Sequence, residues 1–229
     1  AKARLFRELG VTRVSLGIQS FTPHVLEILG REHSVQQASE AISILRAARI
    51  SSINIDLMFS IPGQSKADWE ATLLHAISLK PDHISAYNLM YEEDTAFFES
   101  LRRGEMRENG DHDAEFFHLA DEQLTAAGFD HYETSNYAKP SHHSTHNQGY
   151  WRGDALVESE ILNPEASRLE RIALGLRTQD GISLEFLSME SRQRALSFVD
   201  EGLAKISANQ LILIHHGRAL VDPIAAELI

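Results

Sequence analysis

INIDLMFSIPGQ, residues 53–64, is the stretch that decides the fold. Apolar and polar residues alternate from Ile53 to Phe59, with Asn54 and Asp56 on the polar side, and this period of two predicts a β-strand with two unlike faces. The strand ends in the turn Ile61-Pro62-Gly63-Gln64. In parallel sheets, turns that follow the carboxyl ends of strands build binding sites.

One further strand is predicted before this stretch and one after it. VSLGIQ (14–19) alternates in the same way, and HISAYNL (83–89) is a third short run. Helices are predicted between the strands, one beginning at the cap residue Ser34 and one at Ser65, the second stopped by Pro81. The order strand, helix, strand, helix, strand predicts parallel pairing with right-handed crossovers.

The polar face of the sheet favours a partial barrel. An open sheet covered on both faces would need apolar residues where Ser15, Gly17, Asn54 and Asp56 stand, whereas the interior of a barrel is wetter near its mouth. Three strands cannot close a barrel. Since a helix over 3–9 leads directly into the first strand, the chain starts like the middle of a domain.

The composition changes near residue 155, where we expect a domain boundary between 1–154 and 155–229. Before it, a helix over 113–127, a strand near Tyr132 and a polar loop over 139–154 are expected. After it, helices around 167–176 and 191–201, a hairpin turning at Ala208-Asn209 and a terminal helix after Pro223 predict a small helix-helix-wing domain. The fold class is therefore α/β with a helical, winged-helix-like C-terminal domain.

Composition excludes several classes of function. With 21 Lys+Arg against 33 Asp+Glu, the 229 residues carry a net charge of −12, which opposes non-specific binding to nucleic acid. No stretch approaches the roughly 18 apolar residues of a membrane-spanning helix, so a cytoplasmic protein is expected. The absence of cysteine excludes disulfides, thiolate zinc sites and an iron–sulfur cluster held by these residues alone.

Gln19 and Asp56 are the binding residues that the strand pattern itself suggests. An inward Asp near a barrel mouth can hold ribose hydroxyls or a cationic ligand, and the alternative is a carboxylate satisfied by backbone N–H groups or by Arg. Arg31 can clamp a carboxylate, although its spacing alone favours a solvated charge ahead of the Ser34 cap.

A second group of candidates lies in the expected loop. His142, His143 and His146 form an HHxxH sequence suited to a divalent metal or haem iron, and the alternative is that these histidines are merely exposed. Tyr150 and Trp151 follow these histidines, and their rings either face a ligand or pack the loop against the core.

Five motifs together resemble one family, the radical S-adenosylmethionine (SAM) family of oxygen-independent coproporphyrinogen III oxidase-like proteins. They are VTRVSLGIQSF (11–21), LGREHS (29–34), INIDLMFSIPGQ (53–64), HISAYNL (83–89) and HNQGYWRG (146–153). LERIALGLRTQDGI (169–182) and GRALVD (217–222) are similar to the C-terminal domain of that family. The resemblance thus spans nearly the whole chain.

The resemblance implies a six-stranded partial (β/α) barrel whose C-terminal half is present here. It implies that a CxxxCxxC loop holding a [4Fe–4S] cluster precedes residue 1, and that the cluster reduces SAM to methionine and a 5′-deoxyadenosyl radical. By motif, Gln19 and Asp56 correspond to positions that hold the nucleoside of SAM, Arg31 to the partner of its methionine carboxylate, and Met90 to a backbone contact with adenine.

The family has two branches with different functions. One oxidatively decarboxylates two propionates of coproporphyrinogen III, and the other is a haem chaperone that binds haem and delivers it to a receiving protein. HNQGYW (146–151) is similar to the HNxxYW signature of the chaperone branch, which implies a haem site with His146, Tyr150 and Trp151. The chaperone is therefore predicted, with the true oxidase as the alternative; the motif set disfavours an ordinary barrel enzyme using Asp56 as base.

The chain departs from the family pattern at three places. Thr145 stands where the family commonly has Cys, and Ser60 stands where it has Gly. The glycine-rich GxGxGAH stretch expected after Trp151 is absent, since the chain passes from Asp154 to Ala155. Either this protein has lost that stretch or further residues belong between Asp154 and Ala155, and we expect the second.

Overall fold

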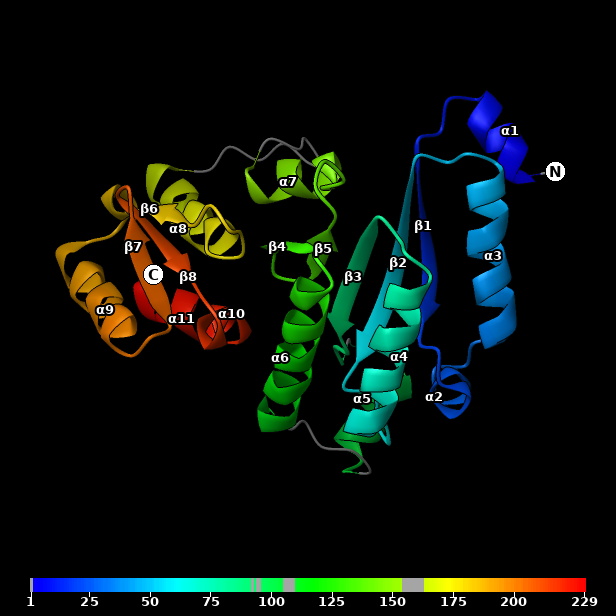
Figure 1. Ribbon diagram of the computed structural model, residues 1–229. Helices are drawn as coiled ribbons and strands as arrows, with labels where there is room; N and C mark the ends of the chain where they lie inside the picture. The colour runs from blue at the N-terminus through cyan, green and yellow to red at the C-terminus, as the bar shows by residue number, and fades with distance from the viewer. Residues whose placement is uncertain (1, 92, 94–95, 105–109, 154–162) are drawn as a thin grey trace. The chain divides into compact units, whose positions relative to one another are not determined.

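A computed structural model describes residues 2–91, 93, 96–104, 110–153 and 163–229, and the chain forms two compact units (Figure 1). Unit 1 is Ala1–Asp130 with Ser135–His142, and unit 2 is His131–Thr134 with His143–Ile229. Each unit has its own hydrophobic core. Segment 143–153, expected in the first domain, belongs to unit 2, where His143 stacks on Tyr132. The expected junction at 154/155 lies outside the described residues.

The sheet of unit 1 confirms the three predicted strands. They are β1 (Arg13–Gln19), β2 (Ser52–Phe59) and β3 (His83–Asn88), and each pairs in parallel with the next. A short strand that was not predicted, β5 (Asn136–Ala138), pairs antiparallel with β3 and continues the order β1-β2-β3-β5. The carboxyl ends of the three parallel strands thus meet at one edge, as the alternation predicts.

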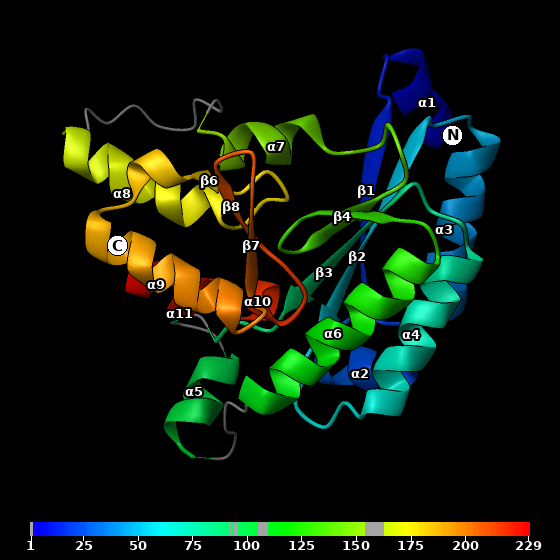
Figure 2. The ribbon, with the colours of Figure 1, turned by 60° about the vertical axis from the view of Figure 1, so that its left-hand side comes forward.

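Helices α3 (Val35–Ala47), α4 (Lys66–Ser78) and α6 (Gly110–Ala126) cover one face of this sheet (Figure 2). Ser34 and Ser65 both form capping boxes, with Gln37 and Asp68 respectively, which explains why α3 and α4 begin where predicted. Hydrogen bonds from Ser65 lower the pKa of Asp68. Trp69 of α4 is fully buried and donates from Nε1 to the Phe116 carbonyl at 3.0 Å, which joins α4 to α6.

The described part of unit 1 also contains three shorter helices. They are α1 (Lys2–Glu8), α2 (Pro23–Ile28) and α5 (Ala96–Arg102), of which only α1 was expected. Pro23 occupies the first turn of α2, where a missing N–H costs nothing. Apolar residues Val25, Ile61 and Leu89 form a small separate cluster that packs α2 against the turns following β2 and β3.

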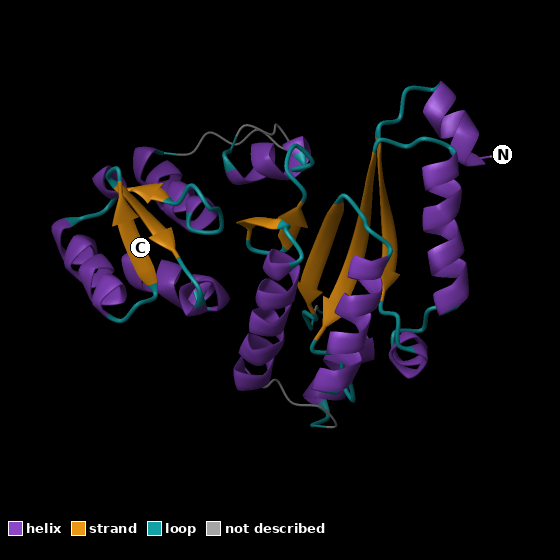
Figure 3. Ribbon diagram, in the orientation of Figure 1, coloured by secondary structure: helices purple, strands orange, loops and turns teal. Residues whose placement is uncertain are grey.

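Unit 2 contains the expected helix-helix-wing arrangement (Figure 3). Strands β6 (Ile182–Ser183), β8 (Gln210–Leu213) and β7 (Ala204–Ser207) form an antiparallel sheet in the order β6-β8-β7, with a 3₁₀ helix (η1) at Leu184–Phe186. Helices α8 (Pro164–Gly175), α9 (Met189–Asp200), α10 (His216–Ala219) and α11 (Val221–Leu228) surround it. The predicted turn is confirmed, because Ala208 and Asn209 both have positive φ, +48° and +66°, as tight hairpins require.

The structure corrects two sequence predictions in unit 2. Residues 139–154 are not all loop, because Ser144 caps helix α7 (Thr145–Trp151) by accepting a hydrogen bond from the Asn147 N–H. The last helix begins at Val221, before Pro223, because proline is tolerated in a first turn. Strand β4 (Asp130–Glu133) forms near Tyr132 as expected. Among the described residues, no helix has the length and apolar composition needed to cross a bilayer.

Candidate functional site

A hydrogen-bonded network lies on the polar face of strands β1, β2 and β3. At its centre, Asn54 Nδ2 donates to Ser15 Oγ at 2.7 Å and to Asp56 Oδ1 at 2.6 Å, and Ser85 Oγ lies 3.1 Å from Asn54 Nδ2 and 3.3 Å from Asn54 Oδ1. Asn54 Oδ1 lies 2.6 Å from His83 Nδ1. Ser15 Oγ donates to Asp56 Oδ2 at 2.7 Å. Both carboxylate oxygens of Asp56 therefore accept a hydrogen bond, which fixes the carboxylate on this face.

The strand register explains the network. Ser15 pairs with Asn54, which pairs with His83, while Asp56 pairs with Ser85, so all five side chains share one face. His83 is fully buried and Asn54 is 2% exposed, whereas Asp56 is half-buried. Because a buried polar group is costly without a partner, His83 and Asn54 hold each other in one orientation. The buried pair of His83 and Asn54 therefore supports the half-buried Asp56, to which Asn54 is hydrogen-bonded.

Gln19 lies at the end of β1, beside Asp56. The register shifts between Gly17 and Gln19, so Gly17 pairs with Asp56 and Gln19 pairs with Leu57. Gln19 has a φ of +69°, an irregular conformation typical of a bulge. A Cβ on Gly17 would come within 3.0 Å of Gln19 Nε2, so the glycine makes room for the amide. The structure thus brings Gln19 and Asp56 to neighbouring strand positions.

Arg31 and Met90 lie in segments that follow the strand ends. Arg31 is exposed, and within the described residues its guanidinium forms no ion pair. Its neighbour His33 places Nε2 3.1 Å from the Ile18 carbonyl, which ties this segment to the end of β1. Met90 is 76% exposed and directly follows Leu89, whose N–H donates to the Phe59 carbonyl at 3.0 Å.

The turn after β2 carries polar atoms that the network does not use. Gln64 is buried, and its Oε1 accepts from the Ile61 N–H at 3.2 Å. Gln64 Nε2 and Ser60 Oγ are buried with no hydrogen-bond partner within the part of the chain that the structure describes. Such atoms at the carboxyl edge of a parallel sheet can bind the hydroxyl, carbonyl and amine groups of a ligand.

Helix α7 organises the HNQGYW sequence in unit 2. His146 and Tyr150 are four residues apart, so they share one face of the helix, and Asn147 and Trp151 share the next. His146 and Tyr150 are exposed, and Trp151 is half-buried. The rings of Tyr150 and Trp151 meet edge to face with centroids 5.0 Å apart. A helix, rather than a loop, therefore sets the geometry of His146.

The structure does not support the alternative in which the HHxxH sequence binds a divalent metal ion. Among the described residues, no group of three or more His, Asp or Glu side chains comes together to hold a metal ion. His142 belongs to unit 1, whereas His143 belongs to unit 2, where its ring stacks on Tyr132 at 4.4 Å. His143 thus has a packing role.

Sequence patterns identified the polar face of the sheet but not the buried contact between His83 and Asn54. Asn54 and Ser15 were visible as polar positions, whereas His83 was not singled out, because its place in the network depends on the register between β2 and β3. The HNxxYW spacing was a usable signal for α7, since it contains two pairs with the i, i+4 spacing of a helix. The Ser144 cap was a second signal.

Comparison with known proteins places this geometry among radical SAM proteins. A model described as the Radical SAM superfamily matches residues 1–76. "Heme chaperone HemW" of Mycobacterium tuberculosis (strain ATCC 25618 / H37Rv) is 32% identical over 260 residues, covering 97% of this chain and 67% of the relative. "Heme chaperone HemW" of Escherichia coli (strain K12) is 39% identical over 147 residues, covering 64% of this chain and 38% of the relative. The 260-residue alignment exceeds the 229 residues of the chain, so the Mycobacterium relative has residues that this chain lacks within the matched region.

A eukaryotic relative and a solved structure extend the comparison. "Radical S-adenosyl methionine domain-containing protein 1, mitochondrial" of Danio rerio is 41% identical over 159 residues, covering 68% of this chain and 36% of the relative. The structure of the Escherichia coli coproporphyrinogen III oxidase HemN superposes with a TM-score of 0.75 at 16% identity, covering 99% of this chain and 66% of the oxidase. This likeness confirms the partial-barrel fold.

Proposed function

We propose a haem-carrying function from one premise: this chain belongs to the radical SAM family of HemW heme chaperones. The observation that carries the proposal is the 32% identity to a heme chaperone over 97% of the chain. The protein would bind haem and deliver it to a receiving protein. We propose the cytoplasm as its location, because a reducing compartment preserves the free thiolates that a cluster needs.

The SAM site is proposed at the carboxyl edge of the sheet in unit 1. Asp56 and Gln19 would hold the nucleoside, Arg31 would pair with the methionine carboxylate, and Met90 would offer its backbone to adenine. In support, Asp56 is half-buried and fixed by two hydrogen bonds, and the Arg31 guanidinium has no ion-pair partner within the described residues. When bound, SAM supplies radical chemistry in this family; these residues would bind and orient it.

The [4Fe–4S] cluster does not fit residues 1–229, because they contain no cysteine. We expect this 229-residue chain to retain no cluster after anaerobic reconstitution with iron and sulfide. Iron content and visible absorbance are the measurements, and the matched control is the complete protein, in which we propose that a CxxxCxxC loop precedes residue 1. A stable chromophore with about four irons per 229-residue chain would contradict this prediction.

The haem site is proposed on helix α7. His146 would ligate the iron through its imidazole, with Tyr150 and Trp151 beside the macrocycle, because His146 is exposed on the same helix face as Tyr150. We expect His146→Ala in the complete protein to weaken haem binding about tenfold or to shift the Soret band. His24→Ala, which removes an exposed histidine of unit 1, is the control and should leave the haem titration unchanged.

The true oxidase is tested beside the chaperone on the same preparation. Complete protein with its cluster is given haem in one assay, and coproporphyrinogen III with SAM and a reductant under anaerobic conditions in the other. Anaerobic turnover with release of carbon dioxide and no haem titration signal would overturn the chaperone proposal. Haem binding that survives His146→Ala would keep the chaperone function and move the ligand to another residue.

A further inference from the structure

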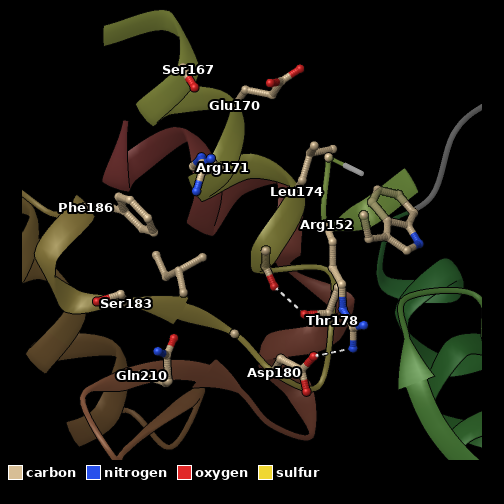
Figure 4. Close-up of a pocket in the computed structure, with 15 residues that line it drawn as sticks. Arg152, Ser167, Glu170, Arg171, Leu174, Thr178, Asp180, Ser183, Phe186 and Gln210 are labelled. Atoms are coloured by element: carbon tan, nitrogen blue, oxygen red, sulfur yellow. Dashed lines mark hydrogen bonds and ion pairs between the residues drawn. The ribbon is translucent and has the colours of Figure 1, made fainter. Parts of the chain in front are cut away.

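A cavity of about 350 Å³ lies wholly within unit 2, and neither the SAM site nor the histidine of α7 accounts for it (Figure 4). It opens between α8, β6, η1 and the end of α7. Its volume falls within the range of small-molecule sites. Its lining includes Trp151, Arg152, Glu170, Arg171, Asp180 and Phe186.

The cavity has a mixed lining, in which the aromatic rings of Trp151 and Phe186 stand among polar and charged side chains, and its two sides differ chemically. Phe186 and Arg171 lie on one side, and Arg152 and Asp180 lie on the other (Figure 4). The Arg171 guanidinium carbon is 5.9 Å from the centroid of the Phe186 ring, within the range of a cation–π contact. An aromatic ring face next to an exposed guanidinium suits a planar ligand that carries an anionic group.

The charges of the lining residues leave one cation available. Arg152 Nη2 pairs with Asp180 Oδ2 at 3.3 Å, which neutralises that side. Arg171 forms no salt bridge within the described part of the chain, and the carboxylate of its neighbour Glu170 points away from the cavity (Figure 4). One unpaired guanidinium matches one carboxylate rather than a polyphosphate, whose several charges would meet only one counter-charge.

We propose that this cavity holds the propionate edge of a tetrapyrrole, with one propionate on Arg171 and the ring edge against Phe186. The inference rests on the proposed haem-carrying function and deepens it by naming a second set of contacts. Trp151 connects the two sets, because it belongs to α7, which bears His146, and also lines the cavity. The protein would thus bind the macrocycle through one carboxylate as well as through the iron.

Metal-free protoporphyrin IX is the probe that separates the two sets of contacts, because it has propionates but no iron to ligate. In the complete protein, Arg171→Gln is expected to weaken protoporphyrin IX binding roughly tenfold in a fluorescence titration, and Arg171→Lys to restore part of it. The dimethyl ester of protoporphyrin IX, which lacks the carboxylates, should bind both Arg171→Gln and the unsubstituted protein equally.

Lys205→Gln is the charge-matched control, since Lys205 is an exposed cation of β7 in the same unit and does not line the cavity. It should leave protoporphyrin IX affinity unchanged. If the unsubstituted protein binds haem but Arg171→Gln binds protoporphyrin IX normally, the cavity assignment is overturned and the haem-carrying function stands. If the unsubstituted protein binds neither haem nor protoporphyrin IX, both are overturned.

Discussion

Replacement of Gly217 by alanine should destabilise unit 2 by more than about 3 kcal/mol, a large effect for one added methyl group. Gly217 is buried in helix α10, and a Cβ there would overlap the carbonyl oxygen of Leu203 and lie 2.8 Å from its carbonyl carbon. These are backbone atoms, and the same Leu203 carbonyl accepts a hydrogen bond from the Ile214 N–H at 3.0 Å, so neither side can yield cheaply. Urea unfolding followed by circular dichroism measures the loss.

Gly110→Ala is the matched control for that substitution. Gly110 is also helical, at the start of α6, but none of the residues that the structure describes lies within 4 Å of an added Cβ. Its replacement should change the free energy of unfolding by no more than about 1 kcal/mol, and in the stabilising direction, because alanine is the better helix former. Equal unfolding midpoints for Gly217→Ala and the unsubstituted protein would show that the Leu203 backbone can move aside.

Asp56→Ala in the complete protein should weaken SAM binding by about 1 to 3 kcal/mol, which is roughly 5- to 150-fold. The carboxylate is the half-buried member of the β1–β3 network, and its removal deletes the proposed acceptor for the hydroxyls of the nucleoside. Calorimetric titration with SAM gives the affinity. Ser15→Ala, which removes one donor to Asp56 but leaves the carboxylate, should have the smaller effect.

The alternative role of Asp56 gives a different result in the same experiment. If the carboxylate serves only to satisfy Asn54 and Ser15, Asp56→Ala lowers the free energy of unfolding and leaves SAM affinity unchanged. That outcome would remove Asp56 from the proposed SAM site. A loss of affinity with an unchanged circular dichroism spectrum supports the binding role.

Local sequence signals were sufficient for the framework of unit 1. The alternation in residues 53–59 places β2 within one residue, and the two serine caps place α3 and α4, because each signal depends on neighbours within four residues along the chain. The short strands β5, with three residues, and β6, with two, were not predicted. They are too short to show a sequence pattern, because their pairing with other strands determines them.

The candidate site was predictable only in part, for a related reason. The polar residues of β1 and β2 follow from alternation, but the buried contact between His83 and Asn54 depends on which residues pair across the sheet. The cavity of unit 2 joins side chains from five elements, far apart in sequence, and no periodicity links Arg171 with Phe186. Helix α7 was missed although Ser144 and the i, i+4 pairs were present, because the polar residues, histidines and glycines of segment 139–154 were interpreted as loop.

The divided segment His131–Thr134 has a consequence for biosynthesis. This segment belongs to unit 2, and two of its backbone groups bond to residues much later in the chain: Thr134 N–H donates to the Arg177 carbonyl at 2.8 Å, and the His131 carbonyl accepts from Arg218 Nη1 at 3.0 Å. A ribosome releases residues in order, so unit 1 can fold while these contacts are still missing. Unit 2 acquires these two contacts only once the chain has been made as far as Arg218 in α10, whereas the stacking of Tyr132 on His143 needs only the next eleven residues.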